Sequence, residues 1–357
     1  MMIIQILPTL SYGDGVSNSA LSIYKIINEL GYRTLIYAEN IDKKLKYKYI
    51  KKIRNLKKVD KSDIILYHLS IGSQLNNVLK NYMCKKIIIY HNITPFKYFE
   101  EYNQLAVELS YSGLCETKLL KDAADYYWAD SEFNKEELIS YGYKCNINVV
   151  PIPIDFNAYK INPNFSIINR YRDDDYINII FVGRISPNKK QEDIIKTFYY
   201  FHNSINKKSR LFLVGSFNGM ERYYEKLKRY IKNLKLDEVY FTGHLQFKEM
   251  ISYYHLADIF LCMSEHEGFC IPLLEAMYFK VPVIAYVSSG VADTMGDAGF
   301  HIKDRDCKVA AEAINQILSN SNLKNYIIKK QNARLLDFEY EKTKDEIKKL
   351  LIKYINN

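Results

Sequence analysis

Two successive series of short apolar runs, separated by segments of helical periodicity, constrain the fold of this chain more than any other feature. Strands that alternate with helices are typical of parallel sheets covered by helices on both faces. The first series predicts strands at 3–7, 34–37, 64–67, 86–90, 126–129 and 147–150, and the second series predicts strands at 177–182, 211–214, 239–242, 259–262 and 281–285. The pattern therefore predicts an α/β protein.

A break separates the two series. Pro151 and Pro153 interrupt regular structure, and the polar stretch Asn162 to Asp175 is interpreted as a linker. At 357 residues the chain is long enough for two domains with separate cores. We expect a domain over residues 1–165 and a second over 166–337, with an amphipathic helix at about 338–357 that belongs to the first. Two such halves imply a cleft, and ligands in these folds bind beyond the carboxyl ends of the strands.

Composition excludes several classes of protein. Hydrophobic residues make up 48% of the chain, and no apolar run approaches the roughly 20 residues that span a bilayer. Met1 to Leu7 has no basic residue and is interpreted as a strand and not as a signal peptide, so we expect a cytoplasmic protein. The cysteines show no C-x-x-C spacing, which favours free thiols over disulfides or zinc. They are Cys84, Cys115, Cys145, Cys262, Cys270 and Cys307.

The net charge of +9 is concentrated in one segment, Lys43 to Lys61, where Asp60 is the only acid. One interpretation is a solvated surface, and a second is a basic face for anionic lipid. Nucleic-acid binding is a third and weaker interpretation, because no nucleic-acid motif accompanies the charge. The apolar residues of the segment are spaced to form one face of a helix, although they can equally pack on the domain core. They are Leu45, Tyr49, Ile53 and Leu56.

The strongest chemical motif runs from Glu267 to Glu275, after the strand that ends near Cys262. Pro272 suits the first position of a helix, because its missing N–H has no helical partner there. No Ser, Thr or Asp precedes it to cap the helix, so backbone amides are left for an anionic ligand. Gly268 permits close approach of backbone and ligand. This turn is therefore a predicted anion site.

A second motif, from Val182 to Lys189, follows the first strand of the second series. Arg184 and Lys189 lie on either side of a Pro-Asn turn, so both side chains can point at one anion. A guanidinium and an ammonium group there neutralise a pyrophosphate leaving group without a metal ion. We therefore expect no metal and no other cofactor.

Together these motifs resemble those of the retaining glycosyltransferases of family four, which have the GT-B fold of two facing Rossmann-like domains. Glu267 and Glu275 match the family's paired glutamates, which have seven residues between them, and Gly183, Arg184 and Lys189 match its Gly-Arg…Lys motif. The resemblance extends to further segments along nearly the whole chain. These are Gly13 to Asn18, Tyr90 to Pro95, Val214-Gly215, Val239 to Gly243 and Gly290 to Gly296.

The resemblance implies a role for each matched residue. Gly183, Arg184 and Lys189 hold the donor diphosphate, and Glu275 bonds the nucleotide ribose. Glu267 and the backbone of the turn after it contact the sugar, while the base lies near the strand that ends at Phe241, Thr242 and Gly243. His91 can bond a sugar hydroxyl, and His68 is the competing histidine. The remaining expected donor-binding residues are Gly13, Asp14, Gly15, Gly215, Gly268, Phe269, Cys270, Ile271 and Pro272.

Four departures from the family and from other motifs affect these expectations. Cys270 stands where many members have Gly, and Ala292-Asp293 stands where many have Pro-Glu. Gly13-Asp14-Gly15 is not a dinucleotide fingerprint, since Asn18 replaces the third Gly, and is interpreted as a mobile loop facing the diphosphate. Asp173 to Asp175 imitates an Asp-x-Asp metal motif, but its place in the linker indicates a solvated charge run.

The resemblance implies transfer of a hexose from a UDP- or GDP-sugar to a glycan or glycolipid acceptor in surface-polysaccharide synthesis. Mannosyl transfer is one option within this activity. Retention without an enzymic nucleophile implies front-face attack, in which the departing diphosphate takes the acceptor's proton. Two alternatives stay open: an inverting GT-B transferase, which needs a base, and a catalytically silent GT-B partner subunit, which the intact motifs disfavour. A nicotinamide dehydrogenase is disfavoured by the missing glycine.

Overall fold

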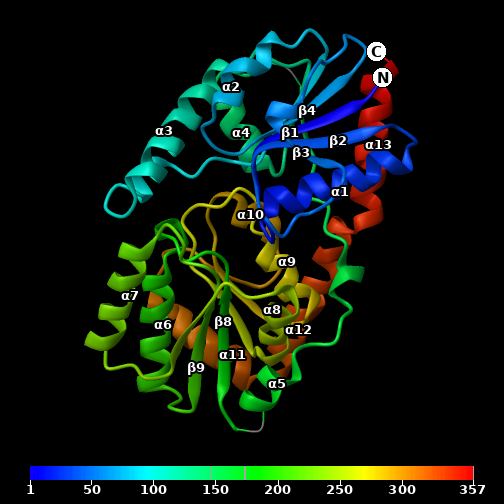
Figure 1. The fold of residues 1–357 in the computed structure, drawn as a ribbon. Helices are drawn as coiled ribbons and strands as arrows, with labels where there is room; N and C mark the ends of the chain where they lie inside the picture. The colour runs from blue at the N-terminus through cyan, green and yellow to red at the C-terminus, as the bar shows by residue number, and fades with distance from the viewer. Residues whose placement is uncertain (145, 173, 357) are drawn as a thin grey trace. The chain divides into compact units, whose positions relative to one another are not determined.

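The two series of strands form two parallel sheets in the computed structural model, which describes residues 1–144, 146–172 and 174–356 (Figure 1). The chain divides into two compact units. Unit 1 consists of Met1–Lys97, Leu105–Asp155 and Phe338–Asn357, and unit 2 of Tyr98–Gln104 and Phe156–Asp337. The change from unit 1 to unit 2 thus falls between Asp155 and Phe156, before the linker that the polar composition indicated.

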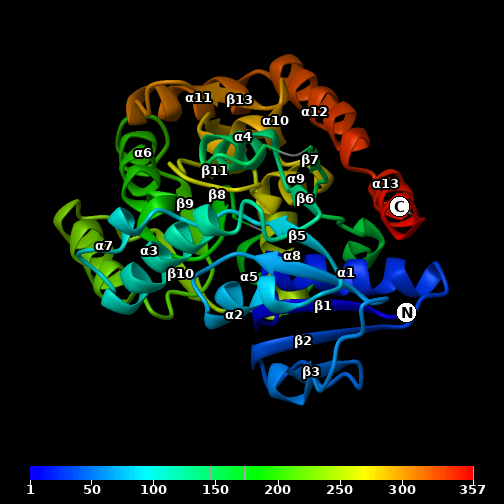
Figure 2. The same cartoon turned by 90° about the horizontal axis from the view of Figure 1, so that it is seen from above.

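Unit 1 contains a seven-stranded sheet in the order β3-β2-β1-β4-β5-β6-β7, which Figure 2 shows from above. Its strands are β1 (Ile3–Leu10), β2 (Thr34–Ile41), β3 (Ile50–Lys52), β4 (Ile64–Leu69), β5 (Lys85–Tyr90), β6 (Tyr126–Ala129) and β7 (Ile147–Val149). Its helices are α1 (Gly15–Glu29), α2 (Gln74–Val78), α3 (Gln104–Leu119), α4 (Glu132–Ser140) and α13 (Tyr340–Asn356). The strand order around β1 is that of a doubly wound nucleotide-binding fold.

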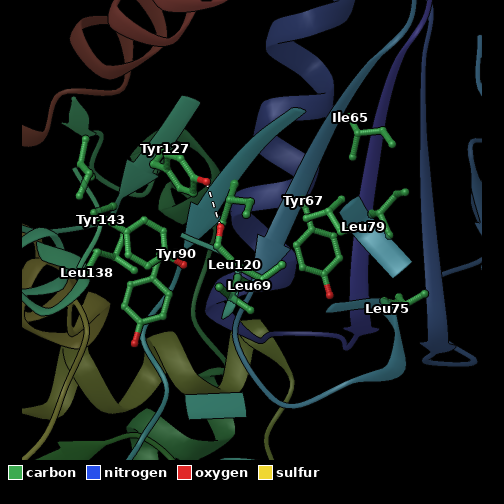
Figure 3. Close-up of a cluster of buried hydrophobic side chains, with 14 of the residues drawn as sticks. Ile65, Tyr67, Leu69, Leu75, Leu79, Tyr90, Leu120, Tyr127, Leu138 and Tyr143 are labelled. Carbon is green, nitrogen blue, oxygen red and sulfur yellow. Dashed lines mark hydrogen bonds between the residues drawn. The ribbon is translucent and has the colours of Figure 1, made fainter. Parts of the chain in front are cut away.

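Successive residues of β4 pack on opposite faces of this sheet, as strand geometry requires. Ile65, Tyr67 and Leu69 join the cluster that is drawn in Figure 3. Ile64 and Leu66 join a second cluster on the other face. Because both faces are buried, these strands read as continuous apolar runs, which is why the sequence locates them well.

The C-terminal helix α13 covers this second face. Ile347 and Leu351 are fully buried in the same cluster as Ile64, and Tyr354 stacks on Tyr126 with ring centroids 3.6 Å apart. Lys348 also donates to Glu29 of α1 at 2.8 Å. The amphipathic helix predicted at the end of the chain therefore returns to the N-terminal sheet, which confirms this part of the predicted fold.

Unit 2 contains a six-stranded sheet in the order β10-β9-β8-β11-β12-β13. Its strands are β8 (Ile177–Val182), β9 (Ser209–Val214), β10 (Val239–Gly243), β11 (Ile259–Cys262), β12 (Val283–Tyr286) and β13 (Phe300–Ile302). Its helices are α5 (Phe165–Tyr171), α6 (Gln191–Ser204), α7 (Glu221–Asn233), α8 (Phe247–Leu256), α9 (Ile271–Tyr278), α10 (Ser289–Met295), α11 (Cys307–Ser319) and α12 (Ser321–Leu335). This is again the doubly wound strand order, so the predicted pair of Rossmann-like domains is confirmed.

Short 3-10 helices connect several of these elements. They are η1 (Ile53–Asn55), η2 (Leu79–Asn81), η3 (Phe96–Tyr98), η4 (Phe156–Tyr159), η5 (Pro187–Lys189) and η6 (Leu336–Phe338). The described part of the chain includes no helix that combines the length and the apolar character needed to cross a membrane.

The apolar helical face expected between Lys43 and Lys61 is wrong. The segment forms the edge strand β3, the turn η1 and irregular backbone. Leu45 is buried with Leu7 and Ile36, and Tyr49 stacks on Tyr24 of α1 at 3.7 Å between ring centroids. Ile53 and Leu56 pack against the other core cluster. Because β3 pairs in parallel with β2, these four side chains pack on two faces of the core. Most of the lysines, together with Tyr47 and Arg54, remain exposed.

The described cysteines form no disulfide, and two aspartates of the linker pair with basic side chains. Cys84, Cys115, Cys262, Cys270 and Cys307 are free thiols, while Cys145 lies outside the described residues. Asp173 also lies outside them. Asp174 pairs with Arg210, and Asp175 lies 3.5 Å from Lys208, so these two aspartates neutralise neighbouring cations.

Gly113 on α3 provides a test of the packing in unit 1. A Cβ atom at Gly113 would lie 2.5 Å from the backbone nitrogen of Gly72, which itself donates to the carbonyl of Leu109 at 2.9 Å. Alanine normally stabilises a helix by about 1 kcal/mol relative to glycine. Here we predict that Gly113→Ala lowers the free energy of unfolding by about 1–3 kcal/mol through overpacking. Urea unfolding measures this free energy, and Cys115→Ala, at an exposed position of the same helix, is the control. A stabilised Gly113→Ala protein contradicts the packing.

Candidate functional site

The candidate site of unit 2 lies at the carboxyl ends of β8 and β11. These two strands are hydrogen-bonded neighbours, and the strand order reverses at β8. In doubly wound folds this reversal marks the place where ligands bind. The loop after β8 carries Arg184 and Lys189, and the loop after β11 carries Glu267. Both predicted motifs are therefore brought to one edge of one sheet.

The loop after β8 is held by its own buried polar side chains. Ser186 Oγ donates to Asn188 Oδ1 at 2.8 Å, and Gln191 Nε2 donates to the carbonyl oxygen of Arg184 at 2.9 Å. Ser186, Asn188 and Gln191 are all buried. Arg184, in contrast, is exposed. The loop thus presents the Arg184 guanidinium to solvent from a rigid backbone.

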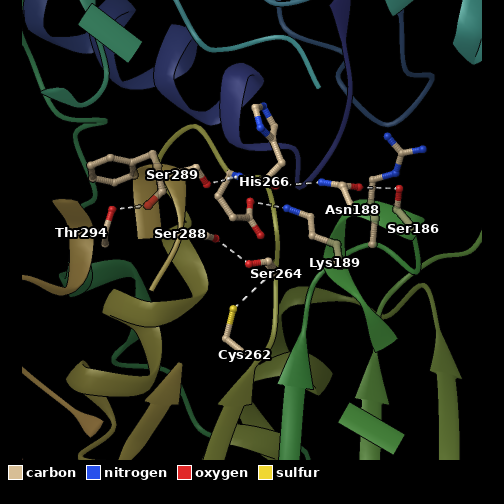
Figure 4. A network of polar contacts seen from close by, with 12 residues as sticks. Ser186, Asn188, Lys189, Cys262, Ser264, His266, Ser288, Ser289 and Thr294 are labelled. Atoms are coloured by element: carbon tan, nitrogen blue, oxygen red, sulfur yellow. Dashed lines mark hydrogen bonds and ion pairs between the residues drawn. The ribbon is translucent and has the colours of Figure 1, made fainter. Parts of the chain in front are cut away.

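Asn188 also joins this loop to the loop after β11, as Figure 4 shows. Its Nδ2 donates to the carbonyl oxygen of His266 at 2.9 Å, and its carbonyl oxygen accepts from the backbone N–H of Glu265 at 2.9 Å. The two motifs are therefore fixed relative to each other by backbone contacts as well as by their charged side chains.

Lys189 and Glu267 form an ion pair at the centre of the site (Figure 4). Their side chains are 20% and 10% exposed, respectively. Burial lowers the pKa of Lys189, but the adjacent Glu267 carboxylate outweighs this effect, and the pKa lies above its ordinary value. Lys189 is therefore held as a cation, and two of its three N–H donors remain for a ligand.

The backbone around Glu267 is positioned by helix α10. The N–H of Glu267 donates to Ser289 Oγ at 2.9 Å, and the N–H of Gly290 donates to the carbonyl oxygen of Glu267 at 2.9 Å. A Cβ atom at Gly290 would lie 2.2 Å from the carbonyl oxygen of Gly268. Thr294 Oγ1 donates to the carbonyl oxygen of Phe269. Only glycine at position 290 allows the helix to support the turn this closely.

The turn into α9 has the geometry that the sequence predicted. Cys270 is the N-cap residue, and no side chain caps the helix, while Pro272 stands in the first turn beside Ile271. Cys270 adopts the left-handed conformation with φ of 71°. This explains why glycine is common at that position in the resembling family, since a side chain is strained there. The thiol is buried and therefore does not fill the ligand side of the turn.

Glu275 is buried in α9 and bound by two tyrosines. Its Oε1 accepts from the hydroxyl of Tyr159 at 2.6 Å, and its Oε2 accepts from the hydroxyl of Tyr254 at 2.7 Å. Burial raises the pKa of the Glu275 carboxyl, and the two hydroxyl groups partly reverse this. Each carboxylate oxygen retains a further acceptor position. The predicted ribose contact is not tested by this arrangement and stays a prediction.

The residues expected near the base lie at the end of β10. Phe241 packs edge-on against Tyr224 at 4.9 Å, and Tyr224 stacks on Phe217 at 4.0 Å between ring centroids. Thr242 donates to the carbonyl oxygen of Gly243 at 3.1 Å. A Cβ atom at Gly215 would lie 2.0 Å from the carbonyl oxygen of Gly183, so the two glycines let the ends of β8 and β9 approach. Phe217 and Tyr224 were not predicted as neighbours of this strand end.

In unit 1, Gly13, Asp14 and Gly15 form the turn into α1. Asp14 is the N-cap residue, and its Oδ2 accepts from the backbone N–H of Ser17 at 3.2 Å. Gly13 has φ of 78°, which favours glycine. The segment interpreted as a mobile loop is therefore a capped helix start, and its contact with a diphosphate stays a prediction.

His91 follows β5 and is buried, with its side chain only 1% exposed. Its Nδ1 lies 2.7 Å from Asp130 Oδ2, and its Nε2 lies 2.8 Å from Nδ1 of His68. Both ring nitrogens are thus engaged within unit 1, so a sugar hydroxyl can bind His91 only by replacing one of these contacts. His68, the competing candidate, is fully buried and contacts Gln5.

Several partners of the candidate residues lie outside the sequence motifs. They are Gln5 and Asp130 in unit 1, and Tyr159, Tyr254 and Ser289 in unit 2. Asp130 alone carried a usable signal, because it is an acid directly after a predicted strand. The tyrosines have no such signal in a chain with 32 tyrosines.

Comparison with known proteins places this site in a family. Residues 166–334 match the family described as glycosyl transferases group 1. This range contains β8 to β13 and all of the charged residues of the unit 2 site. The chain therefore contains a glycosyltransferase group 1 domain of the GT-B type.

Two curated relatives are also similar. An uncharacterized glycosyltransferase of Methanocaldococcus jannaschii is 27% identical over 67% of this chain and 61% of its own length. The capsular polysaccharide biosynthesis glycosyltransferase CapM of Staphylococcus aureus is 25% identical over 54% of this chain and 49% of its own length. The chain thus spans 49–61% of the length of these relatives.

Two solved structures share the fold of the whole chain. Sucrose-phosphate synthase of Thermosynechococcus elongatus has a TM-score of 0.78 at 16% identity, with 99% of both chains covered. HepE of Anabaena, crystallised with UDP-glucose, has a TM-score of 0.76 at 18% identity, covering 99% of this chain and all of HepE. At these identities the likeness establishes the fold alone.

The hydroxyl of Tyr159 provides a test of how Glu275 is held. Removing this donor in Tyr159→Phe leaves a buried carboxylate with one hydrogen bond fewer, and we predict a loss of about 1.5–3 kcal/mol in unfolding free energy at pH 8. This loss of stability arises only when the Glu275 carboxyl is ionised. Because burial raises the pKa of that carboxyl, the loss becomes smaller as the pH falls through the raised pKa.

The matched control is Tyr278→Phe, since Tyr278 stacks on Phe156 through its ring alone. In a Glu275→Gln background the cost of Tyr159→Phe is expected to become small and independent of pH. Urea unfolding at several pH values measures the wild type, the three single variants and the double variant. An equal cost with and without the Glu275 carboxylate argues against the bond.

Proposed function

We propose that this protein transfers a hexose from a nucleotide-diphosphate sugar to a glycan or glycolipid acceptor, with retention at the anomeric carbon, in the synthesis of a surface polysaccharide. The observation that carries the proposal is the cluster of Arg184, Lys189 and Glu267 beside an uncapped helix start. The capsular-polysaccharide relative supports the process, and the UDP-glucose bound by HepE supports the class of donor.

Charge accounts for the first half of the reaction. A diphosphate leaving group carries negative charge that grows as its bond to the sugar breaks. Arg184 supplies an exposed guanidinium, and Lys189 is held as a cation by Glu267. The start of α9, which no side chain caps, adds the positive end of a helix dipole. Such preorganised groups stabilise the leaving group without a divalent metal ion, which we propose is not needed.

The contacts of the two glutamates support retention by front-face attack, because they leave neither carboxylate to act as a nucleophile. Glu267 is paired with Lys189, and Glu275 is bound by two tyrosines, so neither is free to attack the sugar. The bond between the anomeric carbon and the diphosphate breaks, and the acceptor oxygen bonds to the same face of that carbon. The acceptor's proton passes to the departing phosphate oxygen. Glu267 and the backbone from Gly268 to Cys270 then serve to position the sugar.

A donor panel is the experiment that tests the activity. UDP-, GDP- and ADP-sugars, including the mannosyl donor, are incubated with the protein, and release of the nucleoside diphosphate is measured with and without an acceptor glycan. We expect one donor class to be hydrolysed slowly and to be turned over faster with acceptor. The anomeric configuration of the product is then read by NMR. An inverted product contradicts retention, and release from none of the donors contradicts the activity.

Substitution of the two cations tests the leaving-group assignment. We predict that Arg184→Ala or Lys189→Ala lowers the turnover of the accepted donor by about 100-fold, comparable to the loss of one oxyanion donor. Lys196→Ala, an exposed lysine of α6, is the control and retains full turnover. All rates are measured in EDTA. Wild-type activity that requires added manganese, or full activity in both alanine variants, refutes the assignment.

We further propose that the protein acts in the cytoplasm and that the lysines between Lys43 and Lys61 hold it reversibly at an anionic membrane surface. Leu45, Tyr49, Ile53 and Leu56 of this segment pack on the core, so we attribute the attraction to the lysines, at about 1 kcal/mol per lysine near the surface. We predict co-flotation with anionic vesicles at low salt, loss at high salt, and none with neutral vesicles. Replacing Lys57, Lys58 and Lys61 by Gln should weaken it. Binding that ignores salt or vesicle charge contradicts this proposal.

A further inference from the structure

A row of four buried polar side chains crosses the sheet of unit 1. Gln5 lies in β1, His68 in β4, His91 directly after β5 and Asp130 directly after β6, and these four strands are consecutive in the sheet. Gln5 and His68 are fully buried, and the side chains of His91 and Asp130 are 1% and 3% exposed. Polar groups in an otherwise apolar sheet are costly unless each is paired, so the pairing of this row determines its chemistry.

Three contacts join the row end to end. Gln5 Oε1 lies 3.0 Å from His68 Nε2, His68 Nδ1 lies 2.8 Å from His91 Nε2, and His91 Nδ1 lies 2.7 Å from Asp130 Oδ2. The two imidazole rings are within 4° of parallel, which suits an in-plane bond between them. All three distances are those of ordinary hydrogen bonds, so each contact contains one proton.

Counting these protons sets the charge of the histidine pair. The oxygen of Gln5 is an acceptor only, so the first proton belongs to His68 Nε2. An imidazole is a stronger base than a carboxylate, so the third proton belongs to His91 Nδ1. The middle proton lies on His68 Nδ1 or on His91 Nε2. In either case the two rings together hold three N–H protons, so one of the two rings is an imidazolium.

Burial and charge balance place the extra proton on His91. Burial, together with the neighbouring His91, lowers the pKa of His68 well below its ordinary value. His91 is next to the Asp130 carboxylate, which His68 does not contact. A cation on His91 and an anion on Asp130 make the buried row neutral overall.

Rotation of the Gln5 amide gives the competing state. Its Nε2 would then donate to His68 Nε2, both imidazoles would be neutral, and the Asp130 charge would be buried without a counter-ion. The observed orientation instead leaves Gln5 Nε2 without an acceptor among the described residues. An unpaired neutral amide donor costs less than an uncompensated buried charge, so the observed orientation is favoured.

We infer that Gln5 and His68 are positioning residues that keep His91 as an imidazolium, with both of its ring nitrogens donating. An imidazolium has no lone pair to accept the proton of an acceptor hydroxyl. His91 therefore cannot be the base that an inverting mechanism needs. This consequence supports a retaining reaction, and it is the only part of the inference that rests on the proposed function. Its charge can still act on the negative charge that develops during transfer.

Ring protonation is measured directly by NMR on the full chain labelled with ¹⁵N-histidine at neutral pH. We expect one buried histidine with protons on both ring nitrogens, and a second, also buried, that is neutral and protonated at Nε2. Loss of the first signal set in His91→Gln and of the second in His68→Gln assigns them. A wild-type His91 ring with a single proton overturns the inference.

Two substitutions of Gln5 with nearly the same size separate its acceptor from its packing. Gln5→Glu keeps an oxygen facing His68, so His91 is expected to remain doubly protonated. Gln5→Leu removes the acceptor, so His68 is expected to move its proton to Nδ1 and His91 to lose one. A doubly protonated His91 in folded Gln5→Leu overturns the role of Gln5. If that variant does not fold, the wild type and Gln5→Glu still decide the charge of His91.

This measurement does not depend on turnover. A protein that releases no nucleoside diphosphate from any donor but contains a doubly protonated His91 refutes the proposed function and leaves the charge assignment intact. The reverse result, an active transferase with a singly protonated His91, refutes the charge assignment alone.

Discussion

The parallel pairing of β8 with β11 is the constraint on which the unit 2 site depends. Two parallel neighbours end at the same edge of a sheet, so the loops that follow them must meet there. Lys189 and Glu267 are far apart along the chain and yet form an ion pair for this reason. The contacts of Asn188 with the opposite loop follow from the same geometry, as does the support that α10 gives to the turn before α9.

Buried charge is compensated differently at each position of the molecule. Glu267 has a lysine, Glu275 has two phenols, and His91 has a carboxylate. An ion pair keeps both partners charged, whereas neutral donors leave a carboxyl group with a raised pKa. These arrangements suit a transferase of the proposed kind, because the cations are available to a phosphate while the carboxylates are kept from attacking the sugar.

Sequence patterns predicted the central strands and the charged motifs because both have local signatures. A strand buried on both faces is a continuous apolar run, and the glycines, proline and charges of the two motifs lie within single loops. The short edge strand β3 was missed because its three residues are two lysines and an isoleucine. For the segment around it the sequence left two interpretations open, an apolar helical face and packing on the domain core. Leu45, Tyr49, Ile53 and Leu56 fit helical spacing, although their burial comes from two different core clusters.

The sequence by itself determined the α/β architecture, the two domains and the residue types of the predicted anion site, since these depend on periodicity and on spacing within one loop. Only the tertiary structure decided which partner each buried polar group has. Gln5, His68, His91 and Asp130 lie on four strands that are brought side by side by the sheet order, and Tyr159 reaches Glu275 from a distant segment. Hydrogen bonds act over about 3 Å in space and carry no signature along the chain, so folding has to place the partners first.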